Sequence, residues 1–229
     1  MKIILDTANL EDIRYFNTYY PIVGVTTNPT ILAREGGDVL KLLRDIREII
    51  GEEKELHVQV TETSYEKILE EARLLVGYLG NKKNTYVKIP VSDVGLCVTR
   101  KLVEEGYRVT ITAILTATQA LLAANAGASY VAPYVSRLEN ICEDGVGTVS
   151  DIATMLSYSD ADTEILAASF KTAKEVLDVA CVGCHAATVS SAVMKTLISH
   201  TSTDTSILGF AADWKRAFGD TTFLELLKK

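Results

Sequence analysis

Proline is scarce in this chain, and segments of biased composition are missing. Only 4 of the 229 residues are proline, and no Gly- or Ser-rich linker interrupts the sequence. Domain boundaries usually fall in such linkers, so we expect none before about residue 200. The balance of 48% hydrophobic and 23% charged residues excludes a disordered, collagenous or coiled-coil protein and predicts a globular one.

Long apolar runs and an excess of positive charge are also lacking. No apolar run, including the one that ends at Leu5, approaches the ~20 residues of a membrane span, so we predict no membrane partner. Acidic residues outnumber lysine and arginine by 30 to 23, which gives a formal net charge of -7 and argues against a nucleic-acid partner. Residues 1–6 lack the apolar segment of a secretion signal, which favours the cytoplasm.

Cysteine is too sparse for a disulfide scaffold. We expect the four cysteines to be mostly buried thiols in a reducing compartment: Cys97, Cys142, Cys181 and Cys184. The run from Cys181 to His185 matches a c-type haem attachment pattern and contains a C-x-x-C redox spacing. Because it connects a predicted helix to a predicted strand through a Gly turn, we interpret it as structural.

Histidine is too scattered for a metal site. His57, His185 and His200 lack metal-ligand spacing, so we predict no metal. His57 lies two residues before Gln59 and therefore shares its strand face, which predicts a polar layer inside a barrel.

Short β-branched apolar runs alternate with helical patterns along the chain. Eight runs are predicted strands: Ile3–Leu5, Ile22–Val25, Leu56–Val60, Tyr86–Ile89, Val109–Thr112, Tyr130–Ala132, Ile165–Ala168 and Ala186–Val189. Eight strands, each followed by a helix, predict an α/β fold of the (β/α)8 TIM-barrel type. A doubly wound open sheet is the alternative, although Asp6 to Asn9 stand where its Gly-rich fingerprint would follow the first strand.

Apolar residues repeat at intervals of three and four in the predicted helices. The pattern covers residues 39–50 and 68–76, and Thr63 to Glu66 predict a capping box for the second helix. Residues 204–218 predict an extra C-terminal helix that contains the single tryptophan, Trp214. We expect residues 1–200 to form the catalytic barrel and 201–229 a helical tail of the same domain, which covers either its own barrel or a neighbouring subunit.

Polar residues follow nearly every predicted strand, and in a TIM barrel the chemistry lies at those strand ends. They are Asp6, Asn28, Gln59, Lys88, Thr112, Tyr134, Ser169 and Thr188. Lys88 lies within an apolar strand, where burial lowers the pKa of an amine and makes it a nucleophile toward carbonyls. The alternative is a salt bridge to Asp6, which is itself either a proton-transfer carboxylate or an N-cap for a helix near Leu10.

Other polar residues also admit both a binding and a structural interpretation. Asn28, in the run Val25–Thr30, is either a donor to a substrate hydroxyl or a turn former. Arg137 and Lys171 follow the sixth and seventh strands. They are either ligands of a small anion such as a phosphate or ordinary surface cations.

Five ordered motifs resemble the transaldolase family over roughly residues 3 to 220. They are Leu5–Thr7, Gly24–Pro29, Val87–Pro90, Val131–Arg137 and Ala167–Lys171. The resemblance implies a (β/α)8 barrel in which Lys88 forms a Schiff base with a ketose and Asp6 transfers protons, without a cofactor. It also implies a homo-oligomer, a pentamer or decamer, and a place in carbohydrate metabolism such as the pentose phosphate pathway.

The resemblance assigns roles to further residues. The implied substrate ligands are Thr26, Asn28, Arg137, Ser169 and Lys171, the last three for a phosphate. Transaldolases usually carry Glu and Phe where this chain has Gln59 and Tyr134, and those two residues resemble the fructose-6-phosphate aldolase subgroup. A neutral amide can hold a water but cannot relay its proton, so Tyr134 becomes the candidate acid/base group. Thr112 would complete the water site with Gln59.

The predicted activity is therefore that of a class I aldolase that cleaves or forms fructose 6-phosphate from dihydroxyacetone and glyceraldehyde 3-phosphate. One alternative is a transaldolase that transfers a dihydroxyacetone unit between sugar phosphates. An alternative of another class is a non-catalytic sugar-phosphate-binding barrel, in which Lys88 only forms an ion pair.

Overall fold

The computed structural model describes residues 1–228, and its strands lie where the sequence has β-branched apolar runs. The strands are β1 (Lys2–Asp6), β2 (Gly24–Thr26), β3 (Glu55–Gln59), β4 (Thr85–Pro90), β5 (Arg108–Ile114), β6 (Tyr130–Pro133), β7 (Glu164–Ala167) and β8 (Ala186–Val189). The helices are α1 (Leu10–Tyr19), α2 (Pro29–Glu35), α3 (Val39–Ile50), α4 (Tyr65–Leu79), α5 (Asp93–Glu104), α6 (Ala117–Asn125), α7 (Val135–Glu139), α8 (Gly145–Ser157), α9 (Ala173–Cys181), α10 (Ser191–Ile198), α11 (Thr201–Phe218) and α12 (Phe223–Leu227).

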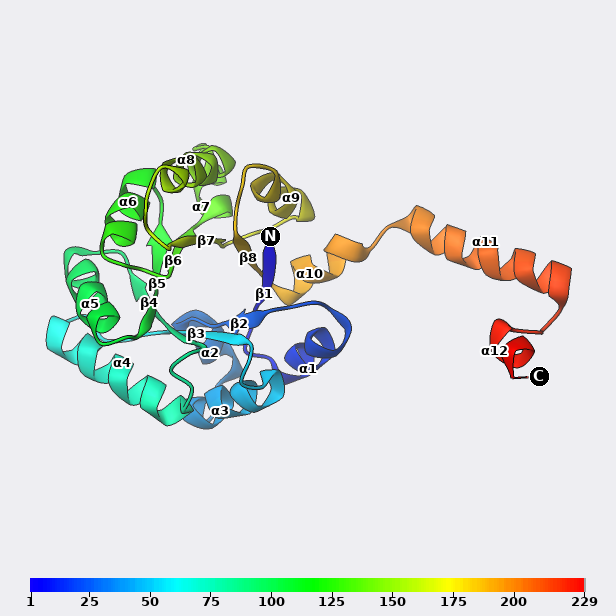
Figure 1. Cartoon of the computed structure of the whole chain (residues 1–229), viewed down its shortest axis with the longest axis horizontal. Helices are drawn as coiled ribbons and strands as arrows, with labels where there is room; N and C mark the ends of the chain where they lie inside the picture. The colour runs from blue at the N-terminus through cyan, green and yellow to red at the C-terminus, as the bar shows by residue number, and fades with distance from the viewer. Residues whose placement is uncertain (229) are drawn as a thin grey trace. The chain divides into compact units, whose positions relative to one another are not determined.

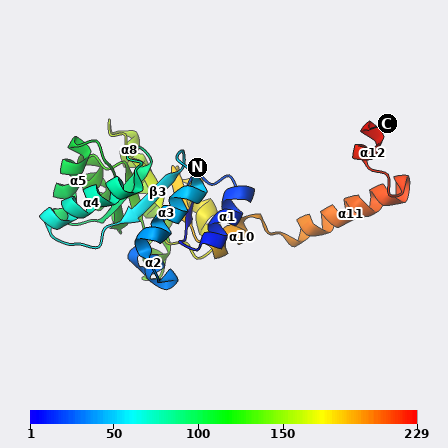
Figure 2. The ribbon, with the colours of Figure 1, turned by 90° about the horizontal axis from the view of Figure 1, so that it is seen from below.

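The eight strands form one closed barrel in which neighbouring strands are parallel. β1 pairs with both β2 and β8, which closes the ring. Helices lie around the strands (Figure 1), and a perpendicular view shows α4 and α5 together at one side of the barrel (Figure 2). The predicted (β/α)8 barrel is confirmed, and the open-sheet alternative is wrong.

The strand registers stack the inward-facing side chains in layers of four, each layer drawn from alternate strands. From the N-terminal ends of the strands upward, the lower three layers are Lys2, Glu55, Arg108 and Glu164, then Gly24, Tyr86, Tyr130 and Ala186, then Ile4, His57, Thr110 and Leu166. The upper two layers are Thr26, Lys88, Ala132 and Thr188, then Asp6, Gln59, Thr112 and Ala168. The upper two layers therefore hold most of the predicted catalytic residues.

His57 belongs to the layer directly beneath Lys88, as the polar-layer prediction requires. Its imidazole is fully buried and stacks on the Tyr86 ring, with 4.4 Å between the ring centroids. Its Nδ1 lies 2.9 Å from the Thr110 Oγ1, and its Nε2 lies 3.2 Å from the Glu55 carboxylate. Burial lowers the pKa of His57, although Glu55 opposes the shift.

The outward-facing strand residues form the main core against the helices. Examples are Leu5, Val25, Val58, Val87 and Ile111, all of them buried. One glycine is required by close packing of the strands: a Cβ on Gly24 would lie 2.4 Å from the backbone oxygen of Glu55. A larger residue would therefore push β2 away from β3.

One predicted helix cap is wrong. α4 begins at Tyr65, and its N-cap, Ser64, makes no side-chain capping hydrogen bond. Because the helix starts one residue later than a cap at Thr63 requires, the third helical position is Lys67, which cannot accept a hydrogen bond from the N-cap. The capping box expected from Thr63 to Glu66 is therefore absent.

The expectation of mostly buried cysteines is also wrong. Three are exposed: Cys97, Cys142 and Cys181. Only Cys184 is buried, and burial raises the pKa of its thiol to about 11. The predicted path of the run from Cys181 to His185, from a helix through a Gly turn to a strand, is confirmed. α9 ends at Cys181, and the chain passes through Gly183, at φ 92°, to β8.

The chain divides into two compact units, Met1–Met194 and Lys195–Lys229. In the second unit, the predicted C-terminal helix is confirmed as α11. The Trp214 ring packs against Phe218 and Phe223, with 4.6 Å between centroids in both cases, and its Nε1 donates to the Thr221 carbonyl at 2.6 Å. In residues 1–228 no helix is both long and apolar enough to span a membrane.

Candidate functional site

Lys88 lies inside the barrel near the C-terminal end of β4. Only 4% of its surface is exposed, and its Nζ donates to the Thr27 carbonyl at 3.1 Å. Across the described residues 1–228 no carboxylate lies within salt-bridge distance of this amine, so the ion-pair interpretation with Asp6 is wrong. Burial lowers the pKa of Lys88, with the charge of Asp6 acting in the opposite direction. Burial thus makes the neutral form of this amine more accessible than it is in a solvent-exposed lysine.

Asp6 ends β1 in the layer above Lys88. Its Oδ1 accepts a hydrogen bond from the Thr26 hydroxyl at 2.6 Å, and that hydroxyl lies 2.5 Å from the Thr188 Oγ1. The N-cap alternative for Asp6 is wrong, because Asn9 caps α1 through hydrogen bonds from two backbone amides. The carboxylate is held by the Thr26 hydroxyl, and its charge acts on the Lys88 amine.

Asn28 follows β2 and serves as the N-cap of α2. Its Oδ1 accepts from the Ile31 backbone N–H at 3.0 Å, which confirms the turn-former interpretation. The cap uses the side-chain oxygen and leaves the amide nitrogen as a donor. The structural role and the predicted binding role are therefore compatible in the same side chain.

A second group of polar residues comes from β3, β5 and the connection after β6. The Thr112 Oγ1 lies 3.1 Å from the Tyr134 hydroxyl, and Gln59 pairs in register with Lys88 on the adjacent strand. The guanidinium of Arg137 stands over the Tyr134 ring, 4.6 Å from its centroid. Such a contact restrains the ring while leaving its hydroxyl directed at Thr112.

The predicted phosphate ligands lie on two adjacent connections, after β6 and after β7. The Ser136 backbone N–H donates to the Ser169 carbonyl at 2.9 Å, which joins the two connections directly. Arg137 lies in α7, and Lys171 directly precedes Thr172, the N-cap of α9. The structure therefore brings these predicted residues to neighbouring strand ends.

Glu175 is a residue of this region that the sequence did not indicate. Its carboxylate accepts from the Ser136 hydroxyl at 2.7 Å, from the Lys171 N–H at 2.7 Å and from the Thr172 N–H at 2.8 Å. Burial acts to raise the pKa of Glu175, but these hydrogen bonds outweigh it and the pKa is lowered. The T-x-x-E spacing from Thr172 was the available signal, since it predicts a capping box.

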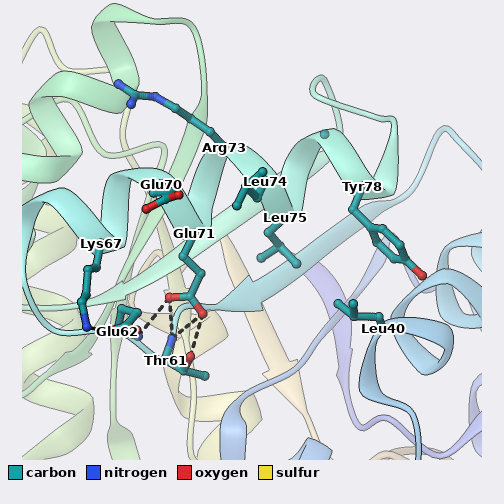
Figure 3. Close-up of a pocket in the computed structure, with 11 residues that line it drawn as sticks. Leu40, Thr61, Glu62, Lys67, Glu70, Glu71, Arg73, Leu74, Leu75 and Tyr78 are labelled. Carbon is teal, nitrogen blue, oxygen red and sulfur yellow. Dashed lines mark hydrogen bonds and ion pairs between the residues drawn. The ribbon is translucent and has the colours of Figure 1, made fainter.

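Two cavities lie away from these residues. One, of about 820 Å³, is lined mainly by α4 and by residues 61 and 62 after β3. There the Glu71 carboxylate accepts hydrogen bonds from the backbone N–H groups of Thr61 and Glu62 (Figure 3). The other, of about 660 Å³, opens at the N-terminal ends of the strands beside Lys2, Glu55 and Arg108. Neither contains a predicted catalytic residue.

Comparison with known proteins identifies relatives over nearly the full length. The model of the family described as "Transaldolase/Fructose-6-phosphate aldolase" matches residues 3–226. A probable transaldolase of Thermoanaerobacter sp. (strain X514) is 41% identical, with 95% of this chain and 98% of that protein covered. A probable transaldolase of Clostridium acetobutylicum is 40% identical, with 95% and 99% covered.

A relative bearing the other activity name is nearly as similar. A probable fructose-6-phosphate aldolase of Streptococcus pneumoniae is 37% identical, with 93% of this chain and 96% of that protein covered. Among solved structures, a flavocytochrome b2 variant with sulfite bound superposes with a TM-score of 0.59 at 13% identity, covering 83% of this chain and 56% of that one. At that identity the likeness concerns the barrel fold alone.

Proposed function

Because the chain belongs to the transaldolase/fructose-6-phosphate aldolase family, we propose that it is a class I aldolase that cleaves or forms fructose 6-phosphate through a Schiff base on Lys88. The observation that carries this proposal is the buried Lys88 amine, which has no salt-bridge partner within residues 1–228 and faces the barrel interior one layer below Asp6. A lysine in such surroundings is a nucleophile toward a ketone.

The reaction begins with the neutral Lys88 amine, which attacks C2 of fructose 6-phosphate to give a carbinolamine. Loss of water from the carbinolamine leaves a protonated imine, and Asp6 is the nearby carboxylate that moves the protons this step requires. The sugar phosphate group is held by Arg137, Ser169 and Lys171, and the Asn28 amide donates to a sugar hydroxyl. Binding at both ends of the substrate places C2 at Lys88.

Cleavage follows when Tyr134 accepts the proton of the C4 hydroxyl. The C3–C4 bond then breaks, its electron pair moves into the imine to give an enamine, and glyceraldehyde 3-phosphate leaves. The protonated imine is the electron sink. Protonation of the enamine at C3 and hydrolysis of the resulting imine release dihydroxyacetone and restore the amine.

Gln59 and Tyr134 favour the aldolase over the transaldolase. An amide at position 59 holds a water together with Thr112 but cannot take its proton, so the acid/base duty falls on the Tyr134 phenol, 3.1 Å from Thr112. The transaldolase is the second candidate, because relatives that are 40% and 41% identical carry that name. In it the enamine attacks a second aldehyde such as erythrose 4-phosphate instead of being hydrolysed.

Two properties accompany the proposed activity. The acidic chain, with a net charge of -7, and its sugar-phosphate substrates fit an enzyme of cytoplasmic carbohydrate metabolism, such as the pentose phosphate pathway. We also infer a homo-oligomer, since large apolar side chains of α11 and α12 are exposed, among them Leu208, Phe210 and Leu224.

The first test measures glyceraldehyde 3-phosphate released from fructose 6-phosphate by the purified protein, without acceptor and then with erythrose 4-phosphate. Repeated turnover without acceptor supports the aldolase, and turnover only with acceptor makes the protein a transaldolase. Borohydride reduction in the presence of substrate should attach a covalent adduct to Lys88. Absence of both adduct and turnover would favour the non-catalytic sugar-phosphate-binding barrel.

The Tyr134→Phe variant separates the steps. Removing the phenol should lower kcat for cleavage by about 10²- to 10⁴-fold, because general acid–base catalysis contributes that much. The borohydride adduct with dihydroxyacetone should still form, because Lys88 remains in place. Tyr19→Phe, on the exposed surface of α1, is the matched control and should behave as the wild type.

A further inference from the structure

We propose that Ala113 is a positioning residue: it holds a left-handed bulge at the end of β5, and this bulge fixes the backbone of Tyr134 beside Thr112. The inference rests on the function proposed above, because Tyr134 is the acid/base group of that reaction. It concerns how the barrel holds that group, which the sequence pattern did not reveal.

The pairing of β5 with β6 shifts at this point. Ile111 pairs with Val131 and Ile114 pairs with Pro133, so two residues of β5 lie opposite the single residue Ala132. The extra residue is accommodated by Ala113, whose φ is 59°. Together these features define a β-bulge, a device that re-aims the strand beyond it.

The backbone hydrogen bonds show what the bulge changes. The Thr112 carbonyl accepts from Val91 N–H, on the β4 side, at 3.0 Å, whereas the Ile114 carbonyl accepts from Tyr134 N–H, on the β6 side, at 3.0 Å. In a regular strand, residues two apart bond to the same neighbouring strand. The left-handed residue between them therefore turns the Ile114 carbonyl from β4 to β6, where it holds the Tyr134 backbone.

The side chains follow the same reversal. Thr112 faces the barrel interior, and strict alternation would make Ile114 face inward as well. Instead Ile114 is fully buried in the outer core between strands and helices. The interior above Thr112 is thereby left free of an isoleucine side chain, and the Tyr134 hydroxyl reaches Thr112 at 3.1 Å.

Two residues with left-handed backbone, Ala113 and Ser169, lie in the segments that flank the Tyr134 segment. Non-glycine residues with positive φ in residues 1–228 are Ala113, Cys142 and Ser169. Ala113 precedes the carbonyl that binds Tyr134 N–H. The carbonyl of Ser169, on the other side of β6, accepts from the backbone N–H of Ser136, two residues beyond Tyr134. Left-handed conformations are unfavourable for L-residues and persist where surrounding structure imposes them, which often happens at functional sites.

A substitution series at Ala113 tests the proposal through backbone preference. Gly and Asn adopt positive φ readily, Ser does so about as reluctantly as the native Ala, and a β-branched Val strongly resists it. We expect Ala113→Gly, Ala113→Asn and Ala113→Ser to keep kcat within about twofold of wild type. Ala113→Val should lower kcat at least tenfold, with KM within about threefold. The borohydride adduct at Lys88 should form in all four, because Lys88 pairs with Thr110, in the regular part of β5 before the bulge.

Gly80→Val is the matched control, since it places valine at φ 72° at the C-cap of α4, where an added Cβ meets nothing within 4 Å. It should lower the melting temperature as Ala113→Val does but leave kcat unchanged. A kcat that follows side-chain size rather than left-handed preference, with Ser more active than Asn, would overturn the positioning role. So would a full kcat in Ala113→Val. If Ala113→Val does not fold, the Asn and Ser variants decide. A wild-type protein with neither adduct nor turnover would instead refute the proposed function.

Discussion

Lys88 is a cationic residue type in an apolar strand, and its side chain is 4% exposed. Because burial lowers its pKa, the folded protein binds this proton less tightly than the unfolded chain, and folding is disfavoured at pH values below the unfolded pKa of about 10.4. We therefore expect Lys88→Met to abolish the borohydride adduct while raising the free energy of unfolding at pH 7 by about 0.5–2 kcal/mol. Calorimetry measures the gain, which should shrink as the pH rises toward 10.5. An unchanged or lower stability at pH 7 would contradict this.

Single residues also mark the limit of what the sequence alone can decide. Both interpretations of Asn28 could be stated from its neighbours, and the structure combines them in one side chain, with the oxygen as helix cap and the nitrogen as donor. For Asp6 the two interpretations excluded one another, and the choice depended on Asn9, three residues later, providing the cap instead. The local sequence indicates which hydrogen-bond partners a polar group could have, whereas the fold determines which of them it contacts.

At the scale of elements, Glu175 in the first turn of α9 joins the two connections that carry the predicted phosphate ligands. Its carboxylate accepts hydrogen bonds from Ser136 and from the backbone of Lys171. We expect Glu175→Ala to raise KM for fructose 6-phosphate about tenfold, because both connections lose a shared acceptor, and to leave KM for unphosphorylated dihydroxyacetone nearly unchanged. Steady-state kinetics with the two substrates measures the difference.

The control for this variant is a cap on another helix. Asp38 caps α3 by accepting from the Lys41 N–H, and Asp38→Ala should cost about 1 kcal/mol of stability without changing either KM. An equal rise of KM for both substrates in Glu175→Ala would show that the carboxylate stabilises the barrel generally rather than the phosphate site.

The elements were predictable to the extent that each follows a local rule. Apolar β-branched runs located all eight strands, and β8 has the predicted bounds Ala186–Val189. β5 was predicted to end at Thr112, whereas the strand continues through its bulge to Ile114. A bulge depends on pairing with the neighbouring strand, which is a nonlocal property. For the same reason the sequence placed His57 and Gln59 on one strand face but did not show the contacts of His57 with Tyr86 in β4 and Thr110 in β5.

At the scale of the whole molecule, the chain carries more exposed apolar surface on its C-terminal helices than an isolated subunit usually does. Exposed side chains there include Ile207, Leu208, Phe210, Phe218 and Phe223. We expect sedimentation of the full chain to give an oligomer and deletion of residues 201–229 to give a smaller assembly, because this surface would then be missing. The circular dichroism of the deletion variant should still show a folded barrel. An unchanged assembly size would contradict the predicted role of the tail.

Buried titratable side chains in the lower layers of the barrel make the stability of the protein depend on pH. His57 is fully buried, and burial lowers its pKa; Glu55 opposes this shift, and Lys88 and Lys2 reinforce it. Below pH 6.5 the unfolded chain therefore binds a proton that the folded barrel does not. Stability is fully present above pH 6.5 and falls as the pH decreases toward the folded pKa, with a slope of up to about 1.4 kcal/mol per pH unit. Glu55, whose pKa is lowered in the folded state, adds a further loss of stability below about pH 4.5.

Urea titrations from pH 8 to pH 5 should show the loss of stability that is due to His57. His57→Gln, whose amide keeps a donor and an acceptor but does not titrate, should remove most of that slope, whereas His200→Gln in the C-terminal unit should not. A pH-independent stability in the wild type would mean that His57 takes up its proton in the folded barrel as readily as in the unfolded chain. The charged imidazolium would then lie directly beneath Lys88.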